Sequence, residues 1–143
     1  MPLNLIKLCV GCDGIDDLAD WIATTIAEKK RRGLEPVHVH RTRMMPKRVD
    51  EIVPGGSLYW VIKGQIRVRE EILALRAVTD AAGVSHCDIV LSGDLVEVEA
   101  RPCRPFQGWR YLAAEVSPRD LKSEAVADLP VEFLRELAGL GLL

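Results

Sequence analysis

The sequence has few aromatic residues, little net charge and no long hydrophobic run. Its apolar stretches fall far short of the roughly 20 residues that a membrane-spanning helix needs, so no membrane segment is expected. A net charge of −2 argues against a protein that binds duplex nucleic acid through charge alone. No targeting pattern is visible at the N-terminus, which makes a cytoplasmic location the default expectation. The length of 143 residues predicts a single domain over residues 1–143.

Cysteine is also scarce, and the sequence contains only Cys9, Cys12, Cys87 and Cys103. The two-residue spacing between Cys9 and Cys12 suits a zinc site or a redox pair, but a second pair of ligands at regular spacing is missing. In a reducing cytosol all four are expected to be thiols, with Cys9 an inert buried one on a strand. No metal and no cofactor are therefore expected.

Hydrophobic periodicity and turn residues predict an α+β fold. Leu18, Trp21, Ile22 and Ile26 share the apolar face of a helix that Asp13 or Asp16 caps and that ends before Gly33. The run of consecutive strands after residue 57 favours a mixed or antiparallel curled sheet with flanking helices. Strands are expected at 3–10, 36–42, 57–63, 84–91, 95–100 and 108–112, and residues 65–78 are expected to form either one long bent strand or a short helix and a strand. Turns are expected at 80–83 and 92–94. Further helices are expected at 46–52, 118–127 and 130–137, with Pro46 near the first position of the helix at 46–52.

The segment at residues 37–48 combines histidines with bases. Strand alternation places His38 and His40 on one face and Val37 and Val39 on the other. Bases surround the turn into the next helix, where a phosphate or nucleic-acid backbone is expected to bind. The alternative is that the histidines line the wet face of an edge strand and that the bases form ion pairs with Asp50 and Glu51. The bases are Arg41, Arg43, Lys47 and Arg48.

Two further segments interleave aromatic residues with bases. Tyr59 and Trp60 point to opposite faces of one strand, so at most one of them is expected in the core, and the other is available to stack a base. The stretch at residues 101–111 predicts either a recognition loop or a hydrophobic plug built on Trp109. The nearby bases are Lys63, Arg104 and Arg110.

Several blocks of the sequence resemble a bacterial family of uncharacterised proteins, the domain-of-unknown-function family 1489. They include Leu8–Gly11, His40–Met44, Pro46–Arg48, Gly56–Gly64 and Arg104–Leu112. That resemblance implies no activity, catalytic residue or cofactor. The order of a short helix, a Pro/Gly turn and a strand is similar to that of PUA-like barrels, including the ASCH and EVE branches, which implies a module that binds RNA or a modified base.

The sequence therefore predicts a binding module for RNA, a nucleotide or another anionic ligand, with a single-stranded RNA or a nucleotide as the partner. One alternative is a small-molecule enzyme that uses His38 or His40 as general base. The other is a structural interaction protein whose tail, residues 130–143, docks on another chain. The candidate ligand-binding residues are His38, His40, Arg41, Arg43, Lys47, Arg48, Tyr59, Trp60, Lys63, Arg104, Trp109 and Arg110.

Overall fold

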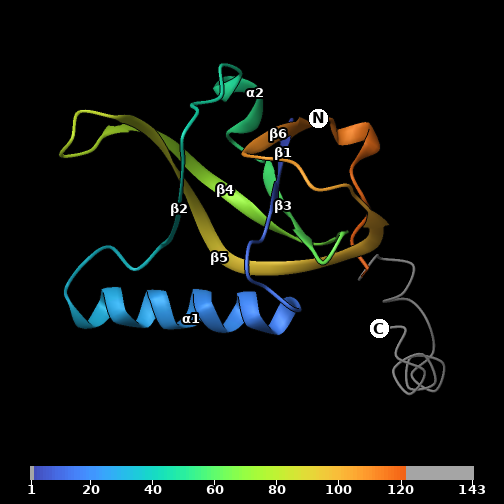
Figure 1. Ribbon diagram of the computed structural model, residues 1–143, viewed down its shortest axis with the longest axis horizontal. Coiled ribbons are helices and arrows are strands. Elements are labelled where there is room, and N and C mark those ends of the chain that lie inside the picture. The colour runs from blue at the N-terminus through green and yellow to red at the C-terminus, as the bar shows by residue number, and fades with distance from the viewer. Residues whose placement is uncertain (1, 122–143) are drawn as a thin grey trace.

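A computed structural model of the protein describes residues 2–121 and confirms the α+β class. Six strands form one mixed, strongly curved sheet in the order β2-β5-β4-β3-β1-β6, with helix α1 lying alongside it (Figure 1). The end strands β2 and β6 are not paired with each other, so the sheet is open and is not a PUA-like barrel. The elements are β1 (Asn4–Leu8), α1 (Ile15–Arg31), β2 (His38–Thr42), α2 (Val49–Ile52), β3 (Ser57–Ile62), β4 (Gln65–Thr79), β5 (Ser85–Pro102), β6 (Trp109–Leu112) and the 3₁₀ turn η1 (Ala114–Val116).

The first strand lies inside the sheet, although it comes first in the chain. β1 pairs in parallel with β3 and antiparallel with β6. Its Lys7 lies beside Trp60 of β3 and beside Trp109 of β6. Cross-strand neighbours share one face of a sheet, so these three side chains leave the same face.

Strands β4 and β5 form one long bent hairpin. The turn at residues 80–83 is the expected one, and the Asp80 carboxylate accepts hydrogen bonds from the backbone N–H groups of Ala82 and Val84. A second turn was expected at Ser92–Asp94, but β5 runs through it without a break. Gly93, at φ +86°, and register shifts in the facing part of β4 bend the hairpin instead of reversing it.

Both faces of the sheet are covered. The larger hydrophobic cluster, which includes Leu58, Trp60 and Leu91, lies under α1, and the smaller one, which includes Tyr59 and Val61, lies under Phe106 and Leu112. The expectation that at most one of Tyr59 and Trp60 is in the core is therefore wrong, because both are buried. Alternation does place them on opposite faces, but each face packs against its own cover.

Helix α1 follows the predicted span but not the predicted cap. Its N-cap is Gly14, and no side chain caps the helix. Leu18 and Ile22 are buried against the sheet, as their spacing predicts, and the chain leaves the helix through Gly33 at φ +72°. Trp21 differs from its expected partners, because 51% of it remains exposed.

The remaining helical predictions are mostly wrong or lie outside the described residues. Helix α2 is a single turn that starts three residues after Pro46. Residues 118–121 are not helical, and Asp120 forms an antiparallel bridge with Val98 of β5, so the start of the expected helix at 118–127 is wrong. Residues 122–127 and the expected helix at 130–137 lie outside the described part. Within residues 2–121, no helix is long and apolar enough to cross a membrane.

Candidate functional site

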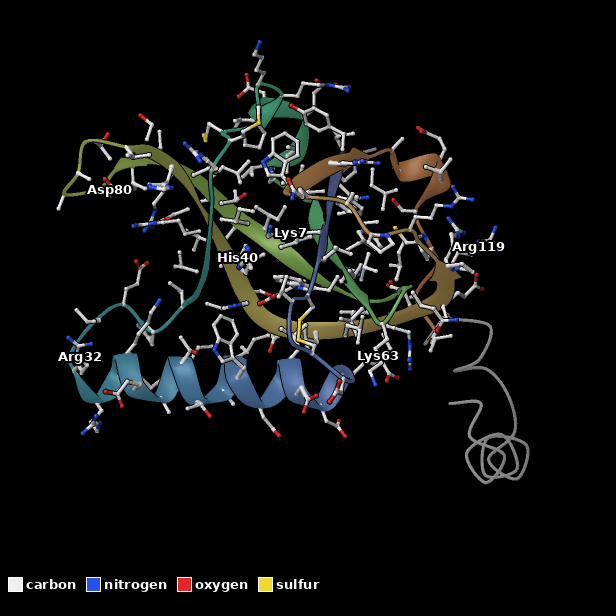
Figure 2. All side chains as sticks on the ribbon, in the orientation of Figure 1. Lys7, Arg32, His40, Lys63, Asp80 and Arg119 are labelled. Carbon is white, nitrogen blue, oxygen red and sulfur yellow. A yellow bond between two sulfur atoms is a disulfide. The ribbon has the colours of Figure 1, made fainter. Side chains whose placement is uncertain are left out.

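A cleft lies between β1, the loop that follows it, α1 and β2, and we call it the Lys7 cleft after its innermost cation. Its volume is about 820 Å³, which is within the range of small-molecule sites. Figure 2 shows Lys7 and His40 near the middle of the sheet, with the disulfide bond between them and α1. The lining residues are Lys7, Leu8, Cys9, Val10, Gly11, Cys12, Asp13, Asp17, Leu18, Trp21, His40, Arg41 and Trp60.

Lys7 supplies a positive charge to a cleft that two acids, Asp13 and Asp17, also line. Burial lowers the pKa of Lys7 below its usual value, since desolvation disfavours the ammonium ion. No carboxylate within residues 2–121 forms a salt bridge with this ammonium group. A half-buried cation of this kind is stabilised by any anion that enters the cleft.

A buried carboxylate holds the wall of the cleft in place. Glu70 of β4 is fully buried and accepts hydrogen bonds from Trp60 Nε1 at 3.2 Å and from the Gly93 backbone N–H at 3.0 Å. His38 Nδ1 lies 2.7 Å from the same carboxylate. Glu70 thus joins β2, β3 and β5 to its own strand. Because it fixes the indole of Trp60, it also fixes the surface that faces the ligand space.

His40 contributes a neutral polar group to the cleft. Its ring lies edge-on to Trp60 with the centroids 5.2 Å apart. Burial, with smaller contributions from Lys7 and His38, lowers the pKa of His40 to about 4. The imidazole is therefore uncharged near neutral pH. Its Nε2 is buried and has no hydrogen-bond partner within the described residues.

The low pKa of His40 makes folding stability depend on pH. The folded-state pKa of about 4 lies below the ordinary 6.5 of an unfolded histidine, so acid protonates the unfolded chain first. The free energy of unfolding is therefore highest above about pH 6.5. It decreases as the pH falls toward 4, by at most about 3 kcal/mol from this group. Urea denaturation of the wild type and of His40→Gln from neutral to mildly acidic pH measures it. The variant should lose less stability, and parallel pH profiles would contradict the assignment.

Trp21 of α1 forms the exposed side of the cleft. Its ring packs edge-on against His38, with the centroids 5.1 Å apart, while half of its surface remains open to solvent. A large, partly exposed aromatic ring beside a cation provides a surface on which a planar group can stack. The sequence pattern assigned Trp21 to the apolar face of α1, and this assignment concealed its place at the cleft.

Of the twelve predicted ligand-binding residues, three line the Lys7 cleft, namely His40, Arg41 and Trp60. Arg41 forms a two-pronged salt bridge with Asp88 of the neighbouring strand, at 2.7 and 3.1 Å. His38 shares a strand face with His40, as predicted, but it is fully buried. The wet-face alternative is therefore wrong for His38, whereas His40 is partly exposed and lines the cleft.

A second group of predicted residues meets where residues 44–48 lie against β6. Trp109 Nε1 donates to the Met44 carbonyl oxygen at 2.7 Å, and the Tyr111 hydroxyl accepts from the backbone N–H groups of Lys47 and Arg48. Arg48 also pairs with Glu51, as the ion-pair alternative predicted. These contacts hold residues 44–48 against β6. They give the aromatic residues of β6 and the backbone of residues 44–48 a structural role.

The other predicted residues are dispersed. Tyr59 faces the opposite side of the sheet, and the Arg110 guanidinium lies over the Phe106 ring, 4.6 Å from its centroid. Lys63, in the β3–β4 turn, forms a salt bridge with Asp13. Arg43 and Arg104 are exposed, and neither forms a salt bridge within residues 2–121.

The cysteine prediction is wrong at one pair. Cys9 and Cys12 are joined by a disulfide, whereas Cys87 and Cys103 are thiols. Burial raises the pKa of Cys87 to about 11, so it is the inert thiol that was expected at Cys9. The described residues contain no cluster of three or more His, Cys, Asp or Glu side chains that could hold a metal ion.

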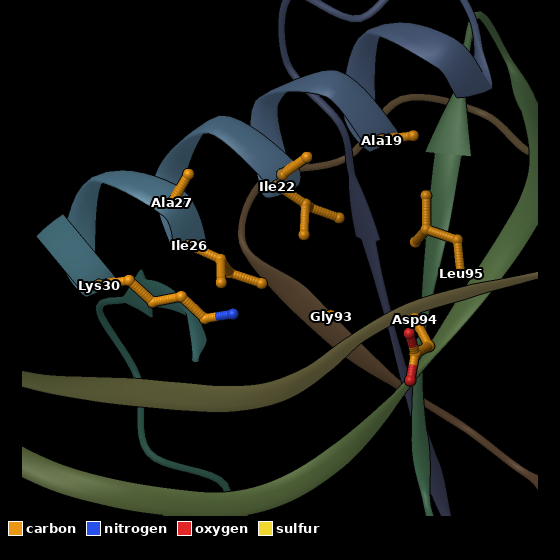
Figure 3. Close-up of a pocket in the computed structure, with 9 residues that line it drawn as sticks. Ala19, Ile22, Ile26, Ala27, Lys30, Gly93, Asp94 and Leu95 are labelled. Carbon is orange, nitrogen blue, oxygen red and sulfur yellow. The ribbon is translucent and has the colours of Figure 1, made fainter. Parts of the chain in front are cut away.

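A second hollow, the α1–β5 groove, lies between α1 and the bend of β5 (Figure 3). Its volume is about 490 Å³, and its lining is mostly aliphatic, with one Lys and one Asp. It offers few polar groups to orient a ligand, so the Lys7 cleft is the better candidate. The groove is lined by Ala19, Ile22, Ala23, Ile26, Ala27, Lys30, Gly93, Asp94 and Leu95.

The sequence of residues 5–143 matches the family described as Protein of unknown function (DUF1489). The chain belongs to this family. The resemblance to DUF1489 is thereby confirmed, whereas the likeness to PUA-like barrels finds no support. The family description assigns no activity, so the case for a function depends on the Lys7 cleft. The chain matches no curated protein and no solved structure.

Sequence reasoning missed Lys7, Trp21 and the cysteine pair as parts of the site. One signal was available for Lys7, the only basic residue among positions 1–28, since it interrupts the apolar strand sequence Leu5-Ile6-Lys7-Leu8. A charged residue within an apolar strand requires either solvent or a partner. The cleft supplies that solvent.

Proposed function

We propose that the Lys7 cleft binds a small anionic ligand that carries a planar ring, such as a nucleoside monophosphate. The observation that supports this most directly is the half-buried ammonium group of Lys7, which has no salt-bridge partner within residues 2–121. The ligand's anionic group pairs with Lys7, and its ring packs at the mouth of the cleft.

The electrostatics of the cleft favour an anion at Lys7. The other cation in the lining, Arg41, is already paired with Asp88, and Asp13 is paired with Lys63. The lining also holds Asp17, which accepts a hydrogen bond from the Asp13 backbone N–H and forms no salt bridge within residues 2–121. Lys7 is thus the cation whose charge remains available inside the cleft. A charge-assisted hydrogen bond to a half-buried ammonium contributes about 1.5–3 kcal/mol, more than a contact with an exposed lysine.

The walls of the cleft favour a planar group beside the anion. Trp21 presents a half-exposed ring, and Trp60 is held rigid by its hydrogen bond to Glu70. Neutral His40 adds a group that can donate or accept a hydrogen bond. A volume of about 820 Å³ accommodates a ligand of nucleotide size.

A small ligand accounts for these features better than a long RNA strand does. Several of the bases expected to meet phosphates are neutralised, Arg41 by Asp88 and Arg48 by Glu51. Binding is also favoured over acid–base catalysis, because a histidine with a pKa of about 4 is a weak proton acceptor near neutral pH. The proposal retains the bacterial cytoplasm as the location.

Titration with adenosine monophosphate, followed by tryptophan fluorescence and calorimetry, tests the proposal. We expect saturable binding, with adenosine binding at least tenfold more weakly because it lacks the anion. Lys7→Met should lower the affinity roughly ten- to hundredfold, the equivalent of one charge-assisted hydrogen bond.

Lys47→Met is the matched control, since it removes an exposed lysine that does not line the cleft and that forms no salt bridge within residues 2–121. Equal affinities of the two variants would refute the role of Lys7. Binding of a single-stranded RNA oligomer with wild-type affinity by Lys7→Met, without binding of adenosine monophosphate, would show that nucleic acid is recognised elsewhere.

A further inference from the structure

The disulfide between Cys9 and Cys12 lies in the wall of the Lys7 cleft, and both residues line it. Between them, Val10 is 90% exposed and Gly11 has a φ of +85°. Both half-cystines are only partly buried. A small molecule in solution can therefore reach this bond.

Lys7 and Cys9 share one face of the chain. The backbone N–H of Cys9 donates to the Val61 carbonyl oxygen at 2.9 Å, which continues the β1–β3 ladder past the end of β1. Because alternate residues of an extended strand point the same way, Lys7 and Cys9 both face the cleft. A neighbouring ammonium group stabilises a thiolate over a thiol, which is the form that takes part in disulfide exchange.

The other cysteines differ in each of these respects. Cys87 is fully buried, and Cys103 packs against the smaller hydrophobic cluster on the opposite face of the sheet. Neither lines the Lys7 cleft. Cys9 and Cys12 are thus the one pair within residues 2–121 that combines a shared bond, solvent access and a nearby cation.

We propose that Cys9 and Cys12 form a redox-active dithiol–disulfide couple that exchanges with small thiols entering the Lys7 cleft. This goes beyond ligand binding, because it assigns a covalent reaction and a second class of substrate to the same cleft. It does not require the anionic ligand to be present.

The reaction balances as two thiol–disulfide exchanges. The thiolate of a small dithiol attacks one sulfur of the Cys9–Cys12 bond, forms a mixed disulfide and releases the other cysteine as a thiolate. The second thiol of the reductant then displaces the bound cysteine and closes its own disulfide. Two electrons and two protons pass to the cysteine pair, and the reductant is oxidised. In the reverse direction, an oxidised dithiol restores the bond.

The test uses the full-length native protein equilibrated with mixtures of reduced and oxidised dithiothreitol. Free thiols are trapped with N-ethylmaleimide and located by peptide mass spectrometry. We expect Cys9 and Cys12 to change together and reversibly, whereas Cys87 stays unlabelled until the protein is denatured. Lys7→Met should slow alkylation of the reduced pair at neutral pH at least threefold, and Lys47→Met should leave it unchanged.

Three results would overturn the proposal. One is that both cysteines remain free thiols under fully oxidised dithiothreitol, and another is that the bond is reduced only in denaturant. The third is that the Lys7 and Lys47 variants react at the same rate. Because binding of adenosine monophosphate is measured separately, failure of the redox proposal and failure of the ligand proposal can be distinguished.

Discussion

Replacement of Glu70 by alanine is expected to lower the free energy of unfolding by about 3–5 kcal/mol. The carboxylate is fully buried and contacts His38, the Trp60 indole and the Gly93 backbone. Its removal leaves those polar groups without a partner in a site that excludes water, and it opens a cavity between four strands. Urea denaturation followed by tryptophan fluorescence measures the change.

Glu71→Ala is the control, because this neighbour is exposed and faces the other side of β4. Its substitution should change stability by less than about 0.5 kcal/mol. If Glu70→Ala does not fold, Glu70→Gln still tests the role of the carboxylate. Glutamine keeps the shape of the side chain, but its amide N–H groups would face groups that themselves donate hydrogen bonds. Equal midpoints for the Glu70 and Glu71 variants would contradict a central role for Glu70.

Replacement of Gly56 by alanine is expected to cost about 3 kcal/mol or more. A Cβ atom there would fall within 3.0 Å of the carbonyl oxygens of Leu3 and Ile52. Both atoms are backbone, and the Gly56 N–H donates to Ile52 at 2.7 Å, so neither can move aside without breaking the junction of α2, β1 and β3. Overpacking of a rigid site typically costs about 1–3 kcal/mol, and contact with two backbone atoms places Gly56 at the upper end.

Gly14→Ala is the matched control for this substitution. Its Cβ would meet nothing within 4 Å, and its φ of −165° is extended backbone. The change should cost no more than about 1 kcal/mol, as expected at a helix N-cap. Thermal unfolding of the two variants should separate them clearly, and similar midpoints would disprove the close approach at Gly56.

Local patterns predicted well where the strands lie in the sequence, but not which face of each strand is buried. Alternation correctly placed His38 and His40 together, yet it carries no information on which face of β2 is covered. That depends on α1 and Trp60, which lie far away in sequence. The same reason explains Tyr59 and Trp60, since the second cover over β3 comes from residues 103–112.

The candidate site could be predicted only in part. Three of its lining residues were expected from the aromatic and basic composition of their segments, namely His40, Arg41 and Trp60. Lys7 and Trp21 looked like ordinary members of a strand and a helix face, and their significance arises from where the sheet order places them. Among the other predicted bases, Arg48, Lys63 and Arg110 are explained by an ion pair or a ring contact. The remaining three, Arg43, Lys47 and Arg104, form no salt bridge within residues 2–121.

The place of β1 between β3 and β6 has a consequence for how the chain reaches its native state. Asn4 pairs with Leu112, which lies 108 residues further along the chain. During synthesis the first strand therefore emerges long before its second neighbour exists. Contacts so distant along the chain slow folding, because a long loop must close before they stabilise the product. Until residues 109–112 arrive, one edge of β1 stays unpaired, and the nascent sheet presents that edge to other chains.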